Sequence, residues 1–198
     1  MTSFNISSHR WHQAVAAAVF TCAMAGAATA APVAAVGSEG LSVIATGGEV
    51  LATFEGNSGS FTSVLYLGSD VTELFNNHLT EIGKVISLGS FAAGTELVFR
   101  MHVNDTGDDF HTGPADRNAD QTAHARAQAE WQPGTTLVSF EDLRGVPEGA
   151  SGYNDMSFSL KGVSVSAVPE PSGLLLAMGG VAALTGLQGK RRLARKGR

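Results

Sequence analysis

The chain has 198 residues, a formal net charge of −5, 24 glycines and a single cysteine, and this length is typical of one globular domain. Residues 31–167 hold six Lys and Arg but seventeen Asp and Glu, whereas six of the last nine residues are basic. Because contacts to phosphate backbones require Lys and Arg, the acidic centre of the chain excludes nucleic acid as a partner.

The first thirty residues have the pattern of a secretory signal peptide. Arg10 and two nearby histidines form a weakly basic start, residues 14–27 are uncharged, and Ala28-Thr29-Ala30 offers small residues for cleavage. We therefore predict that residues 1–30 direct export and are removed after Ala30. The alternative is a retained membrane anchor, which the short, alanine-rich apolar run disfavours.

Cys22, the single cysteine, lies inside this predicted signal. The exported chain would therefore contain no disulfide, no thiolate metal ligand and no cysteine nucleophile. Its stability has to come from a hydrophobic core, with a bound metal ion as a further source.

Short segments with the period of β-strands fill residues 31–167, which we take as one domain. Apolar side chains occupy every second position in residues 97–104, 123–131 and 156–161, as in half-buried strands. Further predicted strands are residues 41–45, 49–54, 61–67, 85–88 and 136–140, with turns at 47–48, 57–59 and 133–134. A short helix is expected within residues 71–79. Seven or eight short strands predict an all-β fold, an antiparallel β-sandwich with a jelly-roll-like arrangement.

The first acidic segment, residues 104–121, is longer than a simple connection needs. Asp116, Asn118 and Asp120 are spaced at every second position, so their oxygen atoms could converge on a hard cation such as Ca²⁺. The segment is not an EF-hand, because Gln121 and Ala127 stand where that loop needs glycine and glutamate. A solvated acidic turn is the alternative.

A second acidic region lies where two predicted strands end and begin. Glu141 and Asp142 follow one strand, and Asn154 and Asp155 precede another. If these strands are neighbours, three carboxylates meet, and a Ca²⁺ ion would relieve their repulsion with oxygen ligands alone. We predict a cation site at Glu141, Asp142 and Asp155, with contributions from Asn154 and Asp120. The alternative is that Asn154 and Asp155 accept hydrogen bonds from loop N–H groups.

The same region carries a family resemblance. Phe140-Glu141-Asp142-Leu143 and Tyr153-Asn154-Asp155-Met156-Ser157-Phe158 resemble the signature of a set of exported bacterial β-domains, the DUF4114-like set. The resemblance covers roughly residues 85–165 and implies a β-sandwich in which the acidic pairs are structural or bind cations. Ser151 departs from the signature, because an acidic residue is usual two positions before the tyrosine.

The end of the chain has three parts in order: Pro169-Glu170-Pro171, uncharged residues 172–189, and basic residues 190–198. As a helix, the uncharged part spans roughly 27 Å, close to a membrane's hydrocarbon core, and the basic end would remain cytoplasmic. The three parts resemble the PEP-CTERM sorting signal. This resemblance implies processing by an exosortase near Pro169-Glu170-Pro171, in a Gram-negative bacterium that makes an exopolysaccharide or biofilm matrix. A plain C-terminal membrane anchor is the alternative.

No catalytic residue is predicted. His102, His111 and His124 lack metal-site spacing and are expected at the surface, and no nucleophile elbow or phosphate-binding loop is present in the sequence. We expect a non-enzymatic surface or extracellular-matrix protein, anchored in the inner membrane as a precursor and then exported. Its expected partners are the exosortase and exopolysaccharide, and its one candidate cofactor is Ca²⁺.

Two other functions remain open at this point. A carbohydrate-binding module would use exposed aromatic rings for stacking on sugars, and its candidates are Trp131, Tyr66 and Tyr153. A glycoside hydrolase would need a pair of carboxyl groups across a sugar cleft, for which Glu141 and Asp155 are the candidates.

Overall fold

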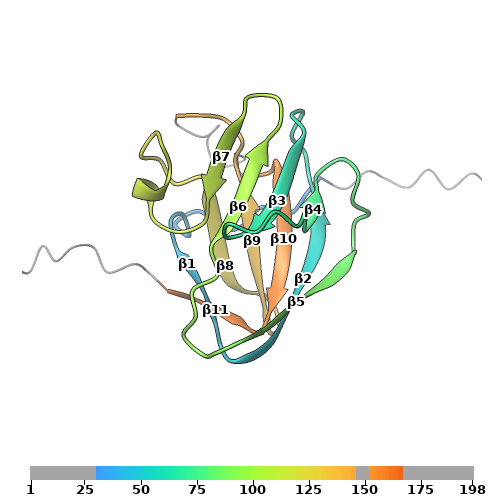
Figure 1. Ribbon diagram of the computed structural model, residues 1–198, viewed down its shortest axis with the longest axis vertical. Helices are drawn as coiled ribbons and strands as arrows, with labels where there is room; N and C mark the ends of the chain where they lie inside the picture. The colour runs from blue at the N-terminus through green and yellow to red at the C-terminus, as the bar shows by residue number, and fades with distance from the viewer. Residues whose placement is uncertain (1–29, 146–151, 167–198) are drawn as a thin grey trace, which may run out of the picture.

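The computed structural model describes residues 30–145 and 152–166 (Figure 1). The predicted sorting tail and all but the last residue of the predicted signal peptide lie outside these ranges. The described elements are β1 (Ser42–Ala45), β2 (Gly48–Gly56), β3 (Ser63–Leu67), β4 (Phe75–Asn76), β5 (Val85–Phe91), β6 (Phe99–Val103), β7 (Asp108–His111), a 3₁₀ turn (Ala115–Arg117), β8 (Ala125–Gln132), β9 (Thr135–Phe140), β10 (Met156–Lys161) and β11 (Val163–Ser166). None of the helical structure in this part of the chain is long and apolar enough to cross a membrane.

Two antiparallel sheets make up most of the domain. One has the strand order β5-β2-β10-β9-β8 and the other β4-β3-β6-β7, while β1 and β11 form a separate pair. The predicted all-β, antiparallel architecture is therefore confirmed, and the two sheets facing one core are consistent with a β-sandwich (Figure 1).

Aromatic rings join the two sheets. The ring centroid of Phe158 on β10 lies 5.0 Å from that of Phe99 on β6 and 6.3 Å from that of Phe75 on β4. Phe54 on β2 lies 5.5 Å from Phe75 across the same core. These tilted contacts stabilise the packing of the sheets beyond the apolar area that they bury.

Residues 32–34 lie against the outer face of β9 and β10 in the five-stranded sheet. The backbone N–H of Ala34 donates to Ser139 Oγ on β9 at 3.0 Å, and Ser157 Oγ on β10 donates to the carbonyl of Pro32 at 2.6 Å. All six residues of β9 are consequently buried, where a half-buried strand would expose every second one.

Contacts around β8 explain why one sequence expectation was wrong. His124 and Arg126 lie on the face that alternation assigns to solvent, yet both are buried, and His124 has no exposed surface. Arg126 Nε donates to Glu39 Oε1 at 2.6 Å, and the N–H of Ala127 donates to the carbonyl of Ser38 at 2.9 Å. Residues 38–40 thus pair with β8 along the edge of the five-stranded sheet.

Residues 71–79 form no helix, contrary to expectation. Phe75 pairs with Leu65 as part of β4, and this pairing places its ring in the core. The side-chain oxygen of Asn76 accepts hydrogen bonds from the N–H groups of His78 and Leu79 and so closes a turn. Such side-chain acceptors compete with helical hydrogen bonds.

Residues 104–121 are also more structured than a loop. They contain β7, which pairs with β6 in the register Met101↔Phe110, and the 3₁₀ turn. Phe110 is buried, so this segment contributes to the core as well as carrying acidic residues.

Candidate functional site

Three carboxylates meet where β9 ends and β10 begins. Phe140, the last residue of β9, is the register partner of Met156, the first residue of β10. Glu141 and Asp142 follow the first strand and Asp155 precedes the second, and one oxygen atom of each lies within 4.8 Å of the others. We call these three residues the acidic triad.

The triad is buried. The exposed fractions are 2% for Glu141, 4% for Asp142 and 8% for Asp155. Within the described part of the chain no ion pair involves any of them, so no basic side chain compensates their charge by direct contact. Burying uncompensated carboxylates is unfavourable unless they are protonated or bind a cation.

Backbone N–H groups orient two members of the triad. Asp155 Oδ2 accepts from the N–H of Asp142 at 2.9 Å, while Glu141 accepts from the N–H groups of Leu143 at 3.1 Å and Tyr153 at 3.2 Å. The alternative prediction, in which Asp155 accepts hydrogen bonds from loop N–H groups, therefore holds for one of its two carboxylate oxygen atoms, Oδ2.

Asp142 differs from its neighbours. Its Oδ2 is buried and has no hydrogen-bond partner among the described residues. Buried polar atoms in proteins are nearly always hydrogen-bonded, and unsatisfied ones mark a role in ligand binding or catalysis, or an ion or water. Of the three such buried atoms among the described residues, which also include Ser63 Oγ and His111 Nδ1, this is the one that lies within the acidic triad.

Burial and mutual repulsion favour the protonated forms of the triad. Burial is the largest cause that raises the pKa of Asp142 to about 6, and the nearby Glu141 and Asp105 add to it. The pKa of Asp155 is also raised to about 6, by burial first and then by the charge of Asp142, and that of Glu141 is raised by burial and Asp155. Ionising Asp142 and Asp155 near neutral pH therefore costs folding stability when no cation is bound.

The triad lines a pocket of about 250 Å³ that also includes Ser58, Ser60, Phe61, Leu143, Gly152 and Asn154. The connection between β2 and β3 forms one wall. The N–H of Ser58 donates to the carbonyl of Asn154 at 2.7 Å, which fixes this connection against the start of β10.

Gly59 allows the wall to approach the triad. A Cβ atom at this position would lie 2.6 Å from Asp155 Oδ1 and 2.9 Å from Asp155 Cβ. Since real Cβ atoms do not come so close to their neighbours, only glycine fits here without moving Asp155. The sequence marks Gly59 as a turn residue, but nothing in it indicates that the turn packs on Asp155.

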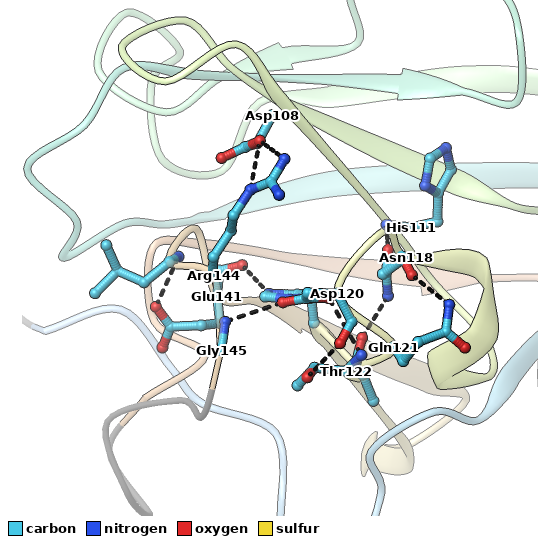
Figure 2. A network of polar contacts seen from close by, with 12 residues as sticks. Asp108, His111, Asn118, Asp120, Gln121, Thr122, Glu141, Arg144 and Gly145 are labelled. Atoms are coloured by element: carbon cyan, nitrogen blue, oxygen red, sulfur yellow. Dashed lines mark hydrogen bonds and ion pairs between the residues drawn. The ribbon is translucent and has the colours of Figure 1, made fainter.

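Asp120, the fifth predicted ligand, is engaged elsewhere (Figure 2). Its Oδ2 lies 2.8 Å from His124 Nε2 and accepts from the N–H of Gly145 at 2.9 Å, and its Oδ1 accepts from the N–H of Thr122 at 3.2 Å. Burial opposes ionisation, but the hydrogen bonds from Gly145, His124 and Thr122 prevail and lower the pKa of Asp120 to about 2.

Asp116, Asn118 and Asp120, the predicted cation ligands of the first acidic segment, have different surroundings. Asn118 Oδ1 accepts from the N–H of His111 at 2.8 Å, and its amide donates to the carbonyl of Thr122 at 2.7 Å. Asp116 is exposed on the 3₁₀ turn. Asn118 is buried and organises the backbone of this segment, so it is not part of a solvated turn (Figure 2).

Two of the three aromatic candidates for sugar stacking are covered. Tyr153 is buried, its hydroxyl donates to the carbonyl of Ala123 at 2.7 Å, and the guanidinium of Arg126 lies 4.2 Å from its ring centroid. Tyr66 has the guanidinium of Arg100 at 4.3 Å from its ring centroid. Trp131 is half-buried.

Comparisons of the chain with protein-family models, with curated proteins and with solved structures give no match.

Proposed function

We propose that this chain is a non-enzymatic surface or extracellular-matrix protein, exported from the cell, whose β-domain binds Ca²⁺ at the acidic triad. The observation that carries the cation site is the buried Asp142 Oδ2, which lacks a hydrogen-bond partner among the described residues and lies beside two other buried carboxylates. A cation would give this oxygen atom a ligand contact and offset the charge that burial leaves uncompensated.

The chemistry of the donors favours Ca²⁺ over other metal ions. Zn²⁺ sites usually contain His or Cys ligands, and the triad offers carboxylate oxygens alone. Ca²⁺ takes six to eight oxygen ligands in flexible geometry, whereas Mg²⁺ demands a near-ideal octahedron. Asn154 also lines the pocket, and solvent water would supply the remaining oxygen ligands.

Ca²⁺ would stabilise the fold at this site. It would link the end of β9 to the start of β10, and these are neighbours in the five-stranded sheet. A ligand that binds only the folded state at 100 times its Kd stabilises that state by about 2.7 kcal/mol. Extracellular Ca²⁺ modules commonly have Kd values of about 10⁻⁴ to 10⁻³ M. With a Kd of about 10⁻⁴ M, about 1 mM Ca²⁺ would stabilise the folded state by about 1.4 kcal/mol.

Export and sorting are proposed from the ends of the sequence. The signal-peptide pattern of residues 1–30 supports export, and Pro169-Glu170-Pro171 with the apolar and basic residues after it supports processing by an exosortase. The precursor would be held in the inner membrane by residues 172–189, and the product would associate with exopolysaccharide. The jelly-roll-like arrangement also stays a prediction, supported by a five-stranded and a four-stranded antiparallel sheet around one core.

Thermal unfolding and calorimetry of the purified full-length chain test the cation site. We expect millimolar Ca²⁺ to raise the melting temperature relative to EDTA, and the Asp142→Asn variant to lose most of this increase. Asp109→Asn is the matched control, because it removes a carboxylate that binds Arg100 and His102 on the other sheet. An unchanged melting temperature at millimolar Ca²⁺ would rule out the proposed site.

A separate experiment tests the sorting proposal. Replacing Glu170 by Ala in the producing bacterium should leave the uncut precursor in the inner-membrane fraction, while the unchanged protein reaches the surface or the medium. Equal release of both proteins would contradict exosortase processing at Pro169-Glu170-Pro171 and would leave the cation site unaffected.

A further inference from the structure

His124 is a fully buried histidine that contacts the backbone of one triad member. Its ring stacks on Phe110 with 3.8 Å between ring centroids. Its Nδ1 lies 3.2 Å from the carbonyl oxygen of Glu141, and its own carbonyl accepts from the N–H of Glu141 at 3.0 Å. The peptide groups on both sides of the Glu141 Cα are thus held by His124.

The other ring nitrogen of His124 leads to Asp120. His124 Nε2 lies 2.8 Å from Asp120 Oδ2, and the same oxygen atom accepts from the N–H of Gly145 at 2.9 Å. Asp120 therefore holds the segment 141–145 at both ends, through His124 at Glu141 and directly at Gly145. Figure 2 shows the direct contact of Asp120 with Gly145.

We propose that Asp120 and His124 form a positioning pair, which holds residues 141–145 so that the Glu141 and Asp142 carboxylates face the pocket, and which sets the affinity for Ca²⁺ without contacting the ion. This proposal rests on the proposed cation site. Both oxygen atoms of Asp120 already accept hydrogen bonds. Turning either toward a cation would leave a backbone N–H without its acceptor, which is unfavourable for a buried group.

The expected effect follows from pre-organisation. Without the pair, residues 141–145 would have to lose conformational freedom when the ion binds, and this entropy loss would weaken binding. Residues that orient metal ligands typically change metal affinity by about 10- to 100-fold when they are replaced. The structural signature of this role is a changed affinity with an unchanged set of ligands.

The test uses Asp120→Ala in the full-length chain, with Tb³⁺ as a luminescent substitute for Ca²⁺. We expect the Kd for Ca²⁺ to rise by about 10- to 100-fold, while luminescence lifetimes in H₂O and D₂O give the same number of Tb³⁺-bound waters as in the unchanged protein. Asp120→Asn should recover part of the affinity, because its amide oxygen can still accept from Gly145. Asp109→Asn is the control and should leave the Kd unchanged.

Two results would overturn the positioning role. One additional bound water in Asp120→Ala would make Asp120 a ligand, and an unchanged Kd with a lower melting temperature would leave it a purely structural residue. If the unchanged protein binds neither Ca²⁺ nor Tb³⁺, the cation site itself is wrong, which separates the two failures.

A measurement on the unchanged protein covers the case in which Asp120→Ala does not fold. Titration with Ca²⁺, followed by NMR, should shift the ring-nitrogen resonances of His124 and the amide resonance of Gly145. Those of His102, which contacts Asp109 on the other sheet, should stay in place. Constant His124 and Gly145 resonances through Ca²⁺ saturation would overturn the coupling.

Discussion

Two acidic regions of this domain look alike in sequence and differ in what surrounds their carboxylates. In residues 104–121, Asp108 is paired with Arg144, Asp109 with Arg100 and His102, and Asp120 with His124 and backbone N–H groups. These partners lower the pKa values of all three Asp residues, although burial opposes the lowering at each of them. The first region is therefore stable with its negative charges in place.

The acidic triad has the opposite electrostatic balance. Glu141, Asp142 and Asp155 are more deeply buried, and their pKa values are raised. Among the described residues, Glu141 and Asp155 accept hydrogen bonds from backbone N–H groups alone. The difference teaches that acidic residues alone do not identify a cation site. What identifies one is a carboxylate that the fold buries without giving it a donor.

The largest expected effect is a reversal of stability in the variant Asp142→Asn. A raised folded-state pKa contributes stability that is present below the unfolded value of 3.8 and is lost as the pH rises through about 6. The shift corresponds to roughly 3 kcal/mol. In EDTA near pH 7.5 the neutral variant should therefore resist urea better than the unchanged protein, and in saturating Ca²⁺ it should resist urea less.

Urea unfolding at pH 4, 5, 6 and 7.5 in EDTA checks this prediction, with Asp109→Asn as control. The stability difference between Asp142→Asn and the unchanged protein should grow between pH 4 and pH 6 and then level off. A variant that is less stable than the unchanged protein at every pH in EDTA would mean that the Asp142 charge is already compensated in the metal-free fold.

The paired region should show the opposite pH dependence. The pKa of Asp120 is lowered from 3.8 to about 2, so its contribution is present above pH 4 and is lost as the pH falls toward 2. Replacing Asp120 by Asn should cost about 2 kcal/mol near neutral pH. The loss should shrink when urea unfolding is repeated near pH 2.5, and a constant loss over this range would assign it to packing rather than to charge.

Gly59→Ala should have a smaller effect, because it acts on the triad through sterics. The added Cβ has to displace Asp155, and overpacking of this kind typically costs about 1–3 kcal/mol. We expect weaker Ca²⁺ binding by calorimetry together with a lower melting temperature. Gly83→Ala is a useful control, since its Cβ would meet no atom within 4 Å, although the positive φ of 86° at that glycine adds some strain. Equal Ca²⁺ affinity in Gly59→Ala and the unchanged protein would show that Asp155 is not a ligand.

Some of this arrangement was predictable from the sequence because it follows from strand ends. The alternation in residues 156–161 and the apolar residues 136–140 place Glu141 and Asp155 at the ends of two strands, and antiparallel pairing of those strands brings the two side chains together. That the triad binds a cation, and that this cation is Ca²⁺, stays a prediction.

The remainder depends on contacts between segments far apart in the chain. The alternation around residue 124 assigns His124 to solvent, but the ring of Phe110 stacks on it and buries it. Arg126, two residues later, is buried beside Glu39, to which it donates. The close approach of Gly59 to Asp155 likewise depends on how the connection after β2 crosses the end of β10. Local periodicity carries no information on such contacts.

The smallest expected effect concerns Arg144, which lies within residues 141–145, the segment that bears the proposed ligands Glu141 and Asp142. Arg144 donates to Asp108, but its side chain is 60% exposed, so solvent and salt screen this pair. Since Asp120 already holds the neighbouring Gly145, replacing Arg144 by Met should change the Kd for Ca²⁺ by less than about twofold and leave the melting temperature nearly the same at high salt. Calorimetry of Arg144→Met in parallel with Asp120→Ala shows which of the two contacts to residues 141–145 contributes more to the affinity for Ca²⁺. A larger loss of affinity in Arg144→Met than in Asp120→Ala would make the exposed ion pair, and not the buried Asp120–His124 contact, the device that orients Glu141 and Asp142.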